Sequence, residues 1–119
     1  MIFSYIDRKE AEQYSFIRIP KALMTEEIFA PLSSHAKIMY GLMIDRMGDS
    51  VKNKWQDDKG RIYVIYPVSE IQQDMQLSRK KVIECLAELE TLGLIEKRKR
   101  GRGLPSILYV KNFVPEVCG

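Results

Sequence analysis

Basic residues gather in two short segments of this chain, and side chains of this type and density suit the binding of phosphate groups. From 97 to 102 the sequence reads KRKRGR, which places five basic residues in six positions. Arg79, Lys80 and Lys81 form a second cluster. The whole chain carries a formal net charge of only +3, so each cluster creates a local positive field that the net charge hides. The pattern favours a polyanionic partner such as nucleic acid.

Both clusters can also be interpreted without a ligand. A charged run can keep an edge strand from pairing with other chains, and Lys80 stands four residues before Glu84, a spacing that allows an ion pair on a helix. However, five like charges at one loop repel one another, and basic residues in the first turn of a helix oppose its dipole. We therefore expect both clusters to contact DNA. Glu84 could accept a hydrogen bond from a cytosine amino group, but pairing with Lys80 is the favoured role.

A helix over 79–92 is expected to position the second cluster. Ser78 is a suitable N-cap and Gly93 a suitable terminator. One face of this helix is apolar and should be buried, and it contains Val82, Leu86 and Leu89. At 100° per residue Lys80 and Glu84 then point away from the core, with Lys81 on the flank.

The surrounding elements predict a winged helix-turn-helix. A short helix capped by Ser69 and a turn at 76–77 precede the 79–92 helix. A strand then begins at Leu94 and Ile95 and runs into the basic segment, residues 101–105 form a flexible tip, and residues 107–110 return as the pairing strand. A helix-turn-helix followed by a β-hairpin is the winged-helix order, in which the second helix reads DNA.

The rest of the chain gives an α+β fold class: a winged helix-turn-helix with an N-terminal β arm. Alternation over 14–19 predicts a strand, and β-branched and aromatic residues over 62–66 predict another, which ends at Pro67. A helix from Ser33 or Ser34 to about Met47 is apolar around most of its circumference and is expected to be buried on two sides. We expect a flexible arm over 1–13, the winged-helix domain over 14–113, and a tail or linker over 114–119.

The expected DNA contacts come from three places. The start of the second helix should reach base edges, one wing pair should follow the backbone while an arginine enters the minor groove, and two glutamines of the first helix could touch phosphates or simply be solvated. The residues concerned are Ser78, Arg79, Lys80, Lys81, Glu84, Gln72, Gln73, Lys97, Arg98, Lys99, Arg100 and Arg102.

Apolar residues outside the winged-helix core predict a homodimer. The arm and the first long helix carry more apolar surface than a core of this size can cover, and such a surplus usually marks an interface. The alternative is that the arm folds back over its own helix. The expected interface contains Tyr14, Phe16, Ile17, Ile19, Leu23, Ile38 and Leu42.

Several classes of function are disfavoured by composition. The two cysteines, Cys85 and Cys118, lie far apart, and His35 is the single histidine, so we expect no metal site and no cofactor. We identify no histidine paired with a serine or cysteine for catalysis, no glycine-rich phosphate loop and no pair of carboxylates in an apolar setting, so we expect no enzyme activity. The chain contains neither a signal peptide nor a membrane-spanning run. We expect a cytoplasmic protein with no membrane partner.

The chain resembles a known family in three long stretches. FIRIPKALMTEEIF, LSSHAKIMYGLMIDRMGDSVKNKWQDDKGRIYVIYPVSEI and LSRKKVIECLAELETLGLIEKRKRGRGLPSILYVKNF are similar to the N-terminal domain of RepA-type replication initiators from low-copy plasmids of Gram-positive bacteria. The resemblance covers about residues 14–113. Its most specific part is the helix over 32–46 together with NKWQDDKGRIYVIY, because the helix-turn-helix alone would fit many regulators.

The resemblance implies that the domain binds double-stranded DNA as a dimer at origin repeats (iterons), and thereby initiates and controls plasmid replication. A separate C-terminal domain would engage host replication proteins. That domain is not present in this chain, which ends at Gly119 and is either a fragment or a short member. Two alternatives stay open. One is a winged-helix transcription regulator that binds an operator, and the other is a winged helix that contacts only protein.

Overall fold

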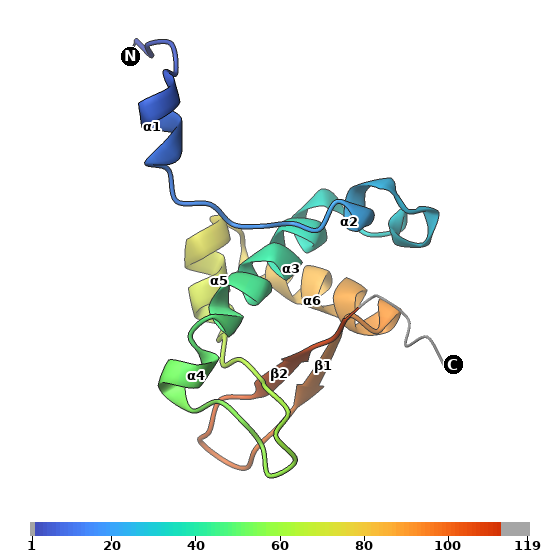
Figure 1. The fold of residues 1–119 in the computed structure, drawn as a ribbon. Helices are drawn as coiled ribbons and strands as arrows, with labels where there is room; N and C mark the ends of the chain where they lie inside the picture. The colour runs from blue at the N-terminus through green and yellow to red at the C-terminus, as the bar shows by residue number, and fades with distance from the viewer. Residues whose placement is uncertain (1, 113–119) are drawn as a thin grey trace, which may run out of the picture.

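A computed structural model describes residues 2–112 as a set of helices followed by one β-hairpin (Figure 1). In chain order the elements are α1 (Arg8–Glu12), α2 (Ala22–Thr25), the 3-10 helix η1 (Glu27–Phe29), α3 (Ser34–Met47), α4 (Ser50–Asn53), α5 (Val68–Met75), α6 (Arg79–Leu92), β1 (Ile95–Arg98) and β2 (Ile107–Val110).

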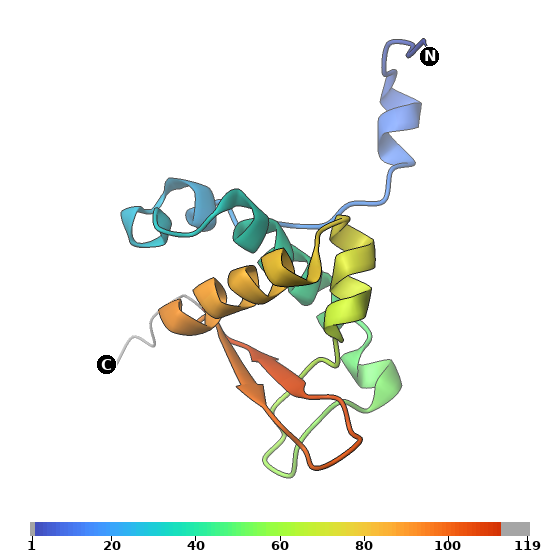
Figure 2. The same ribbon diagram turned by 180° about the vertical axis from the view of Figure 1, so that it is seen from behind.

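Three helices enclose the core, and the hairpin extends from them. Helix α6 packs on both α3 and α5, and β1 continues directly from its end. Figures 1 and 2 show the loop between β1 and β2 beside the loop that precedes α5. This is the winged-helix arrangement, so the predicted fold class is confirmed. Helices α2, α3, α5 and α6 and the segment before α5 all contribute fully buried side chains. These include Leu23, Met39, Met43, Val64, Ile71, Val82, Cys85 and Leu89.

Helix α3 is buried on two sides, as its sequence predicted. Ser33 caps it, with the hydroxyl oxygen accepting from the Ala36 amide at 3.2 Å, and Gly48 follows its last residue. On one side α3 faces α6. On the other, Gly41 lies so close to the N-terminal segment that an added Cβ would be 2.8 Å from Ile19 Cγ1. The segment around Ile19 therefore folds back onto its own helix.

The helix-turn-helix matches the prediction except at one boundary. Pro67, not Ser69, occupies the N-cap of α5, and the helix begins at Val68. A proline fits there because it has no amide hydrogen and its φ of −60° suits a helix start. Gln76 adopts a left-handed conformation with φ 54° and turns the chain toward α6. Helix α6 has the predicted Ser78 cap and Gly93 terminator.

The wing also forms as predicted. Its strands pair antiparallel, in a register from Ile95 opposite Val110 to Arg98 opposite Ile107. The predicted strand over 62–66 is reduced to isolated bridges. Val64 exchanges two backbone hydrogen bonds of 2.9 Å with Leu108, which attaches one residue of this segment to the edge of the hairpin. Pro67 lacks an amide hydrogen, and α5 begins directly after it, so the pairing cannot extend further.

The N-terminal predictions need three corrections. Residues 8–12, expected to be part of a loose arm, form α1, because Asp7 Oδ1 accepts from the Glu10 amide at 2.8 Å and caps the helix. Residues 14–19 form no strand, since alternation alone supplies no partner for the backbone, and none of the described residues pairs with them. Leu23 is fully buried in its own chain and cannot belong to an interface.

A carboxylate of α6 fixes the start of α3. Glu88 Oε1 accepts from the Ser33 amide and Oε2 accepts from the Ser33 hydroxyl, both at 2.7 Å. The same hydroxyl oxygen accepts from Ala36, so one serine joins the two helices and caps one of them. A negative charge at a helix N-terminus is also favourable to the helix dipole.

Replacing Glu88 with alanine should lower the free energy of unfolding by about 1–3 kcal/mol, because two charge-assisted hydrogen bonds are lost and the Ser33 amide loses its acceptor. Thermal unfolding followed by circular dichroism measures the change. Glu90→Ala, an exposed site on the same helix, is the control and should stay within about 0.5 kcal/mol of wild type. Equal stabilities for the two variants would show that this contact does not fix α3.

Candidate nucleic-acid interface

The start of α6 presents two of its three basic residues to solvent, and the third, Lys81, is partly buried. The buried face of the helix contains Val82, Cys85 and Leu89, while Arg79, Lys80 and Glu84 are exposed. The Ser78 hydroxyl oxygen accepts from the Lys81 amide at 3.2 Å, so it serves the cap. Among the described residues no ion pair joins Lys80 to Glu84, so the pairing that we favoured is not formed. Both side chains are therefore available to a ligand.

Helix α5 is attached to α3 by a polar cluster around the buried Tyr66. The Tyr66 hydroxyl donates to Asp74 Oδ2 at 2.5 Å, and burial, followed by this bond, raises the pKa of Tyr66. The Arg46 guanidinium lies 3.9 Å from the centre of the Tyr66 ring, donates to the Ile65 carbonyl and pairs with Glu70 at 2.8 Å. These contacts bind α3, the segment before α5, and α5 into one unit.

The predicted contacts on α5 lie on that unit. Gln73 is exposed and Gln72 is partly buried. The carbonyl of Gln72 accepts from the Leu77 amide at 3.2 Å, within the turn of the motif. The side chain of Gln73 is thus the more accessible of the two.

The wing residues fall into two groups. Lys97, Lys99 and Arg102 are exposed. Arg98 pairs with Glu96 at 3.2 Å, and Arg100 Nε donates to the Pro105 carbonyl at 3.1 Å, which holds the hairpin tip. Arg98 and Arg100 therefore have contacts within the hairpin, while Lys97, Lys99 and Arg102 have no partner among the described residues.

The strand register sets which face each wing residue occupies. Lys97 lies opposite Leu108, on the face that packs toward α6. Glu96 lies opposite Tyr109, and Arg98 shares their face, with its guanidinium 5.0 Å from the centre of the Tyr109 ring. Lys97 and Arg98 therefore lie on opposite faces of the hairpin.

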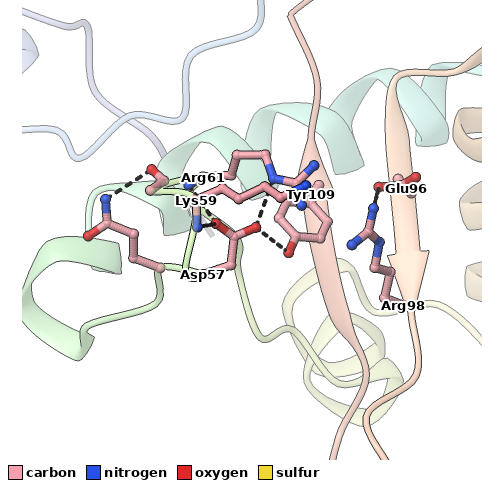
Figure 3. Close-up of polar contacts among 8 residues, drawn as sticks. Asp57, Lys59, Arg61, Glu96, Arg98 and Tyr109 are labelled. Atoms are coloured by element: carbon pink, nitrogen blue, oxygen red, sulfur yellow. Dashed lines mark hydrogen bonds and ion pairs between the residues drawn. The ribbon is translucent and has the colours of Figure 1, made fainter.

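A turn over residues 57–61, which carries Lys59 and Arg61, lies against the wing (Figure 3). Asp57 organises this turn. Its Oδ1 accepts from the Lys59 and Arg61 amides at 3.0 and 2.8 Å, and its Oδ2 accepts from Arg61 Nε at 2.8 Å and from the Tyr109 hydroxyl at 2.9 Å. The turn is thereby attached to β2. The spacing of four residues between Asp57 and Arg61 is the one feature of the sequence that could have indicated their ion pair.

Hydrogen bonding keeps Asp57 ionised. Burial by itself would raise its pKa, but the bonds from Arg61, Tyr109 and Lys59 outweigh burial and lower the pKa from 3.8 to about 2. The same contacts raise the pKa of Arg61. The turn therefore holds its geometry, and its charges, throughout the neutral range.

Within residues 2–112 no group of three or more histidine, cysteine or acidic side chains is placed to hold a metal ion. Across the same residues no helix has the length and apolar character that crossing a bilayer requires. Cys118 and the predicted tail over 114–119 lie outside the described residues.

Comparison with solved structures finds close likenesses. A structure described as the N-terminal domain of a DNA-binding protein matches with a TM-score of 0.78 and 32% identity, over 97% of this chain and 88% of that one. A Rep–DNA complex matches with a TM-score of 0.77 and 31% identity, over 92% and 84%. An MDR initiator matches with a TM-score of 0.75 and 30% identity, over 92% and 86%.

Sequence comparisons agree with the structural ones. A 41 kDa protein of Lactobacillus helveticus is 27% identical over 86 residues, and the match covers 72% of this chain but only 24% of that relative. The family model of the replication initiator protein A (RepA) N-terminus matches residues 15–117. The chain therefore belongs to the family of RepA N-terminal domains.

Proposed function

We propose that this domain binds double-stranded DNA in a sequence-specific manner at repeats of a plasmid origin, and that the whole protein thereby initiates and controls plasmid replication in the cytoplasm. The observation that carries this proposal is the exposed basic start of α6, opposite its buried face and followed in the chain by a basic wing. In winged-helix proteins the second helix enters the major groove and the wing contacts the backbone or the minor groove. The likeness to a Rep–DNA complex supports the proposal.

We assign base recognition to α6 and contacts with the DNA backbone to the wing. Arg79 and Lys80 are exposed at the start of the helix, where they can reach guanine edges, while Glu84 can accept from a cytosine amino group. Lys97, Lys99 and Arg102 suit phosphate contacts because they are exposed on a hairpin. Any contact with host replication proteins would belong to a domain outside this chain.

We also propose a homodimer, because two copies of α6 would read two half-sites. Tyr14 and Phe16 are 51% and 66% exposed, and Ile17 and Ile38 are 38% and 36% exposed. Ile19 and Leu42 are partly buried against their own core, so they contribute less. The proposed interface is accordingly smaller than the sequence indicated.

Salt dependence tests the DNA contact. If about five of the eight basic side chains at 79–81, 97–100 and 102 meet phosphates, log K should fall with log salt at a slope of about −4 to −5 per subunit. Fluorescence anisotropy with a duplex selected from a random library gives this slope. A slope near zero would end the proposal. Enrichment of bound fragments at an operator beside a promoter, instead of at origin repeats, would favour a transcription regulator.

Single substitutions distinguish base recognition from contact with the DNA backbone. Lys80→Ala should weaken the selected duplex more than a scrambled one, by ~1–3 kcal/mol, because a base contact is lost. Lys99→Ala should weaken both duplexes equally, because a phosphate carries no sequence information. Lys21→Ala, exposed at the start of α2, is the charge-matched control and should change neither. Equal losses for both duplexes in Lys80→Ala would exclude α6 as the reader.

Sedimentation tests the dimer. Wild-type protein should sediment as a dimer at high micromolar concentration, and Phe16→Glu should be monomeric, because a carboxylate at an apolar interface must be desolvated. Met24→Glu places the same charge at an apolar side chain that is 63% exposed outside the proposed interface, and should leave the dimer intact. A monomeric wild type, with and without DNA, would refute this interface.

A further inference from the structure

A basic cleft separates the Asp57 turn from the wing. Its volume is about 360 Å³. Five basic side chains line it, two from the turn and three from the wing: Lys59, Arg61, Arg98, Lys99 and Arg100. Two carboxylates, Asp57 and Asp58, face the same space. The cleft therefore has an excess of positive charge drawn from two segments that are far apart in the sequence.

Tyr109 is the central support of this cleft (Figure 3). The guanidinium of Arg61 lies 5.2 Å from the centre of its ring, and that of Arg98 lies 5.0 Å from it. One aromatic ring thus holds two arginines, each of which has one acidic partner. Both guanidinium groups are therefore held at the cleft, where they add positive charge that favours an anion.

The acidic partners leave hydrogen-bond donors unused. Arg61 reaches Asp57 through Nε, and no described residue accepts from its terminal nitrogens. Arg98 pairs with Glu96 through one terminal nitrogen, and Lys59 is held only through its backbone amide. Guanidinium groups present several donors in a fixed geometry that matches phosphate oxygens. The unused donors of the cleft therefore suit a phosphate group.

We propose that this cleft binds a phosphate of the DNA backbone, as a third contact element beside α6 and the wing tip. The inference rests on the proposed function, since the ligand is the DNA that α6 reads. It assigns Lys59 and Arg61 a role in DNA binding. Asp57 and Tyr109 act as positioning residues, because they fix the turn against β2 and do not touch the phosphate.

The carboxylates of the cleft have different effects. Asp57 uses both oxygens for bonds within the turn and to Tyr109, so its charge is largely compensated. Asp58 is exposed, and no described side chain pairs with it, so its charge opposes the incoming phosphate. Removing the charge of Asp58 should therefore strengthen DNA binding, whereas removing that of Lys59 should weaken it. Both residues lie at the surface of one turn, so folding alone does not produce opposite signs.

The test measures Lys59→Ala, Asp58→Asn and the control Lys21→Ala by anisotropy, with the selected duplex and its scrambled form. Lys59→Ala should bind both duplexes roughly two- to fivefold more weakly, which is the scale of one exposed ion pair, and its salt slope should be shallower by about 0.9. Asp58→Asn should bind both more tightly by a similar factor. Lys21→Ala should match wild type.

Arg61→Lys adds a test of geometry. Lysine keeps the charge but loses the planar set of donors, so binding should weaken while the salt slope changes little. Thermal unfolding of each variant confirms that the turn is folded. Variants at 58, 59 and 61 that bind as wild type does would overturn the cleft while leaving α6 and the wing as the DNA contacts. A wild type that does not bind DNA would instead overturn the proposed function itself.

Discussion

The placement of α6 depends on its being held by one face alone. The buried face contains Val82, Cys85 and Leu89, Leu86 and Leu92 pack at its edge, and the carboxylate of Glu88 adds a polar contact to α3. The apolar residues give attraction without direction, because burial is proportional to area and not to angle. The two hydrogen bonds of 2.7 Å from Ser33 to Glu88 are directional, and they attach the start of α3 to one position on α6.

Helix α3 is itself held in place, because the N-terminal segment and α6 both pack on it. Gly41 admits the N-terminal segment on the side away from α6, where a larger residue would meet Ile19 and the Arg18 carbonyl. Arg46, near the other end of α3, contacts Tyr66 and Glu70 and so fixes α5. Both helices of the helix-turn-helix thus contact the same central helix, α3. A shift of α3 would therefore move α6 and α5 together.

Local patterns in the sequence predicted most of these elements, and long-range contacts account for what they missed. Caps and periodicity located α6 and α3, because helix ends are determined by neighbouring residues. The alternating segment over 14–19 was predicted to be a strand, but a strand needs a partner, and a single sequence does not reveal one. Leu23 was assigned to an interface because its apolar character did not show which surface would cover it.

The residues of the candidate site were likewise predicted only in part. The basic residues of α6 and of the wing were found from composition, since charge that repels itself needs a partner. Lys59 and Arg61 were missed because Arg61 stands 36 residues before Lys97, the first basic residue of the wing, and only the fold brings Asp57 within 2.9 Å of the Tyr109 hydroxyl. Tyr109 was expected only to complete a strand. Its hydroxyl instead joins the turn to the wing, so the two basic segments have one fixed geometry, and an anion that meets one of them also meets the other.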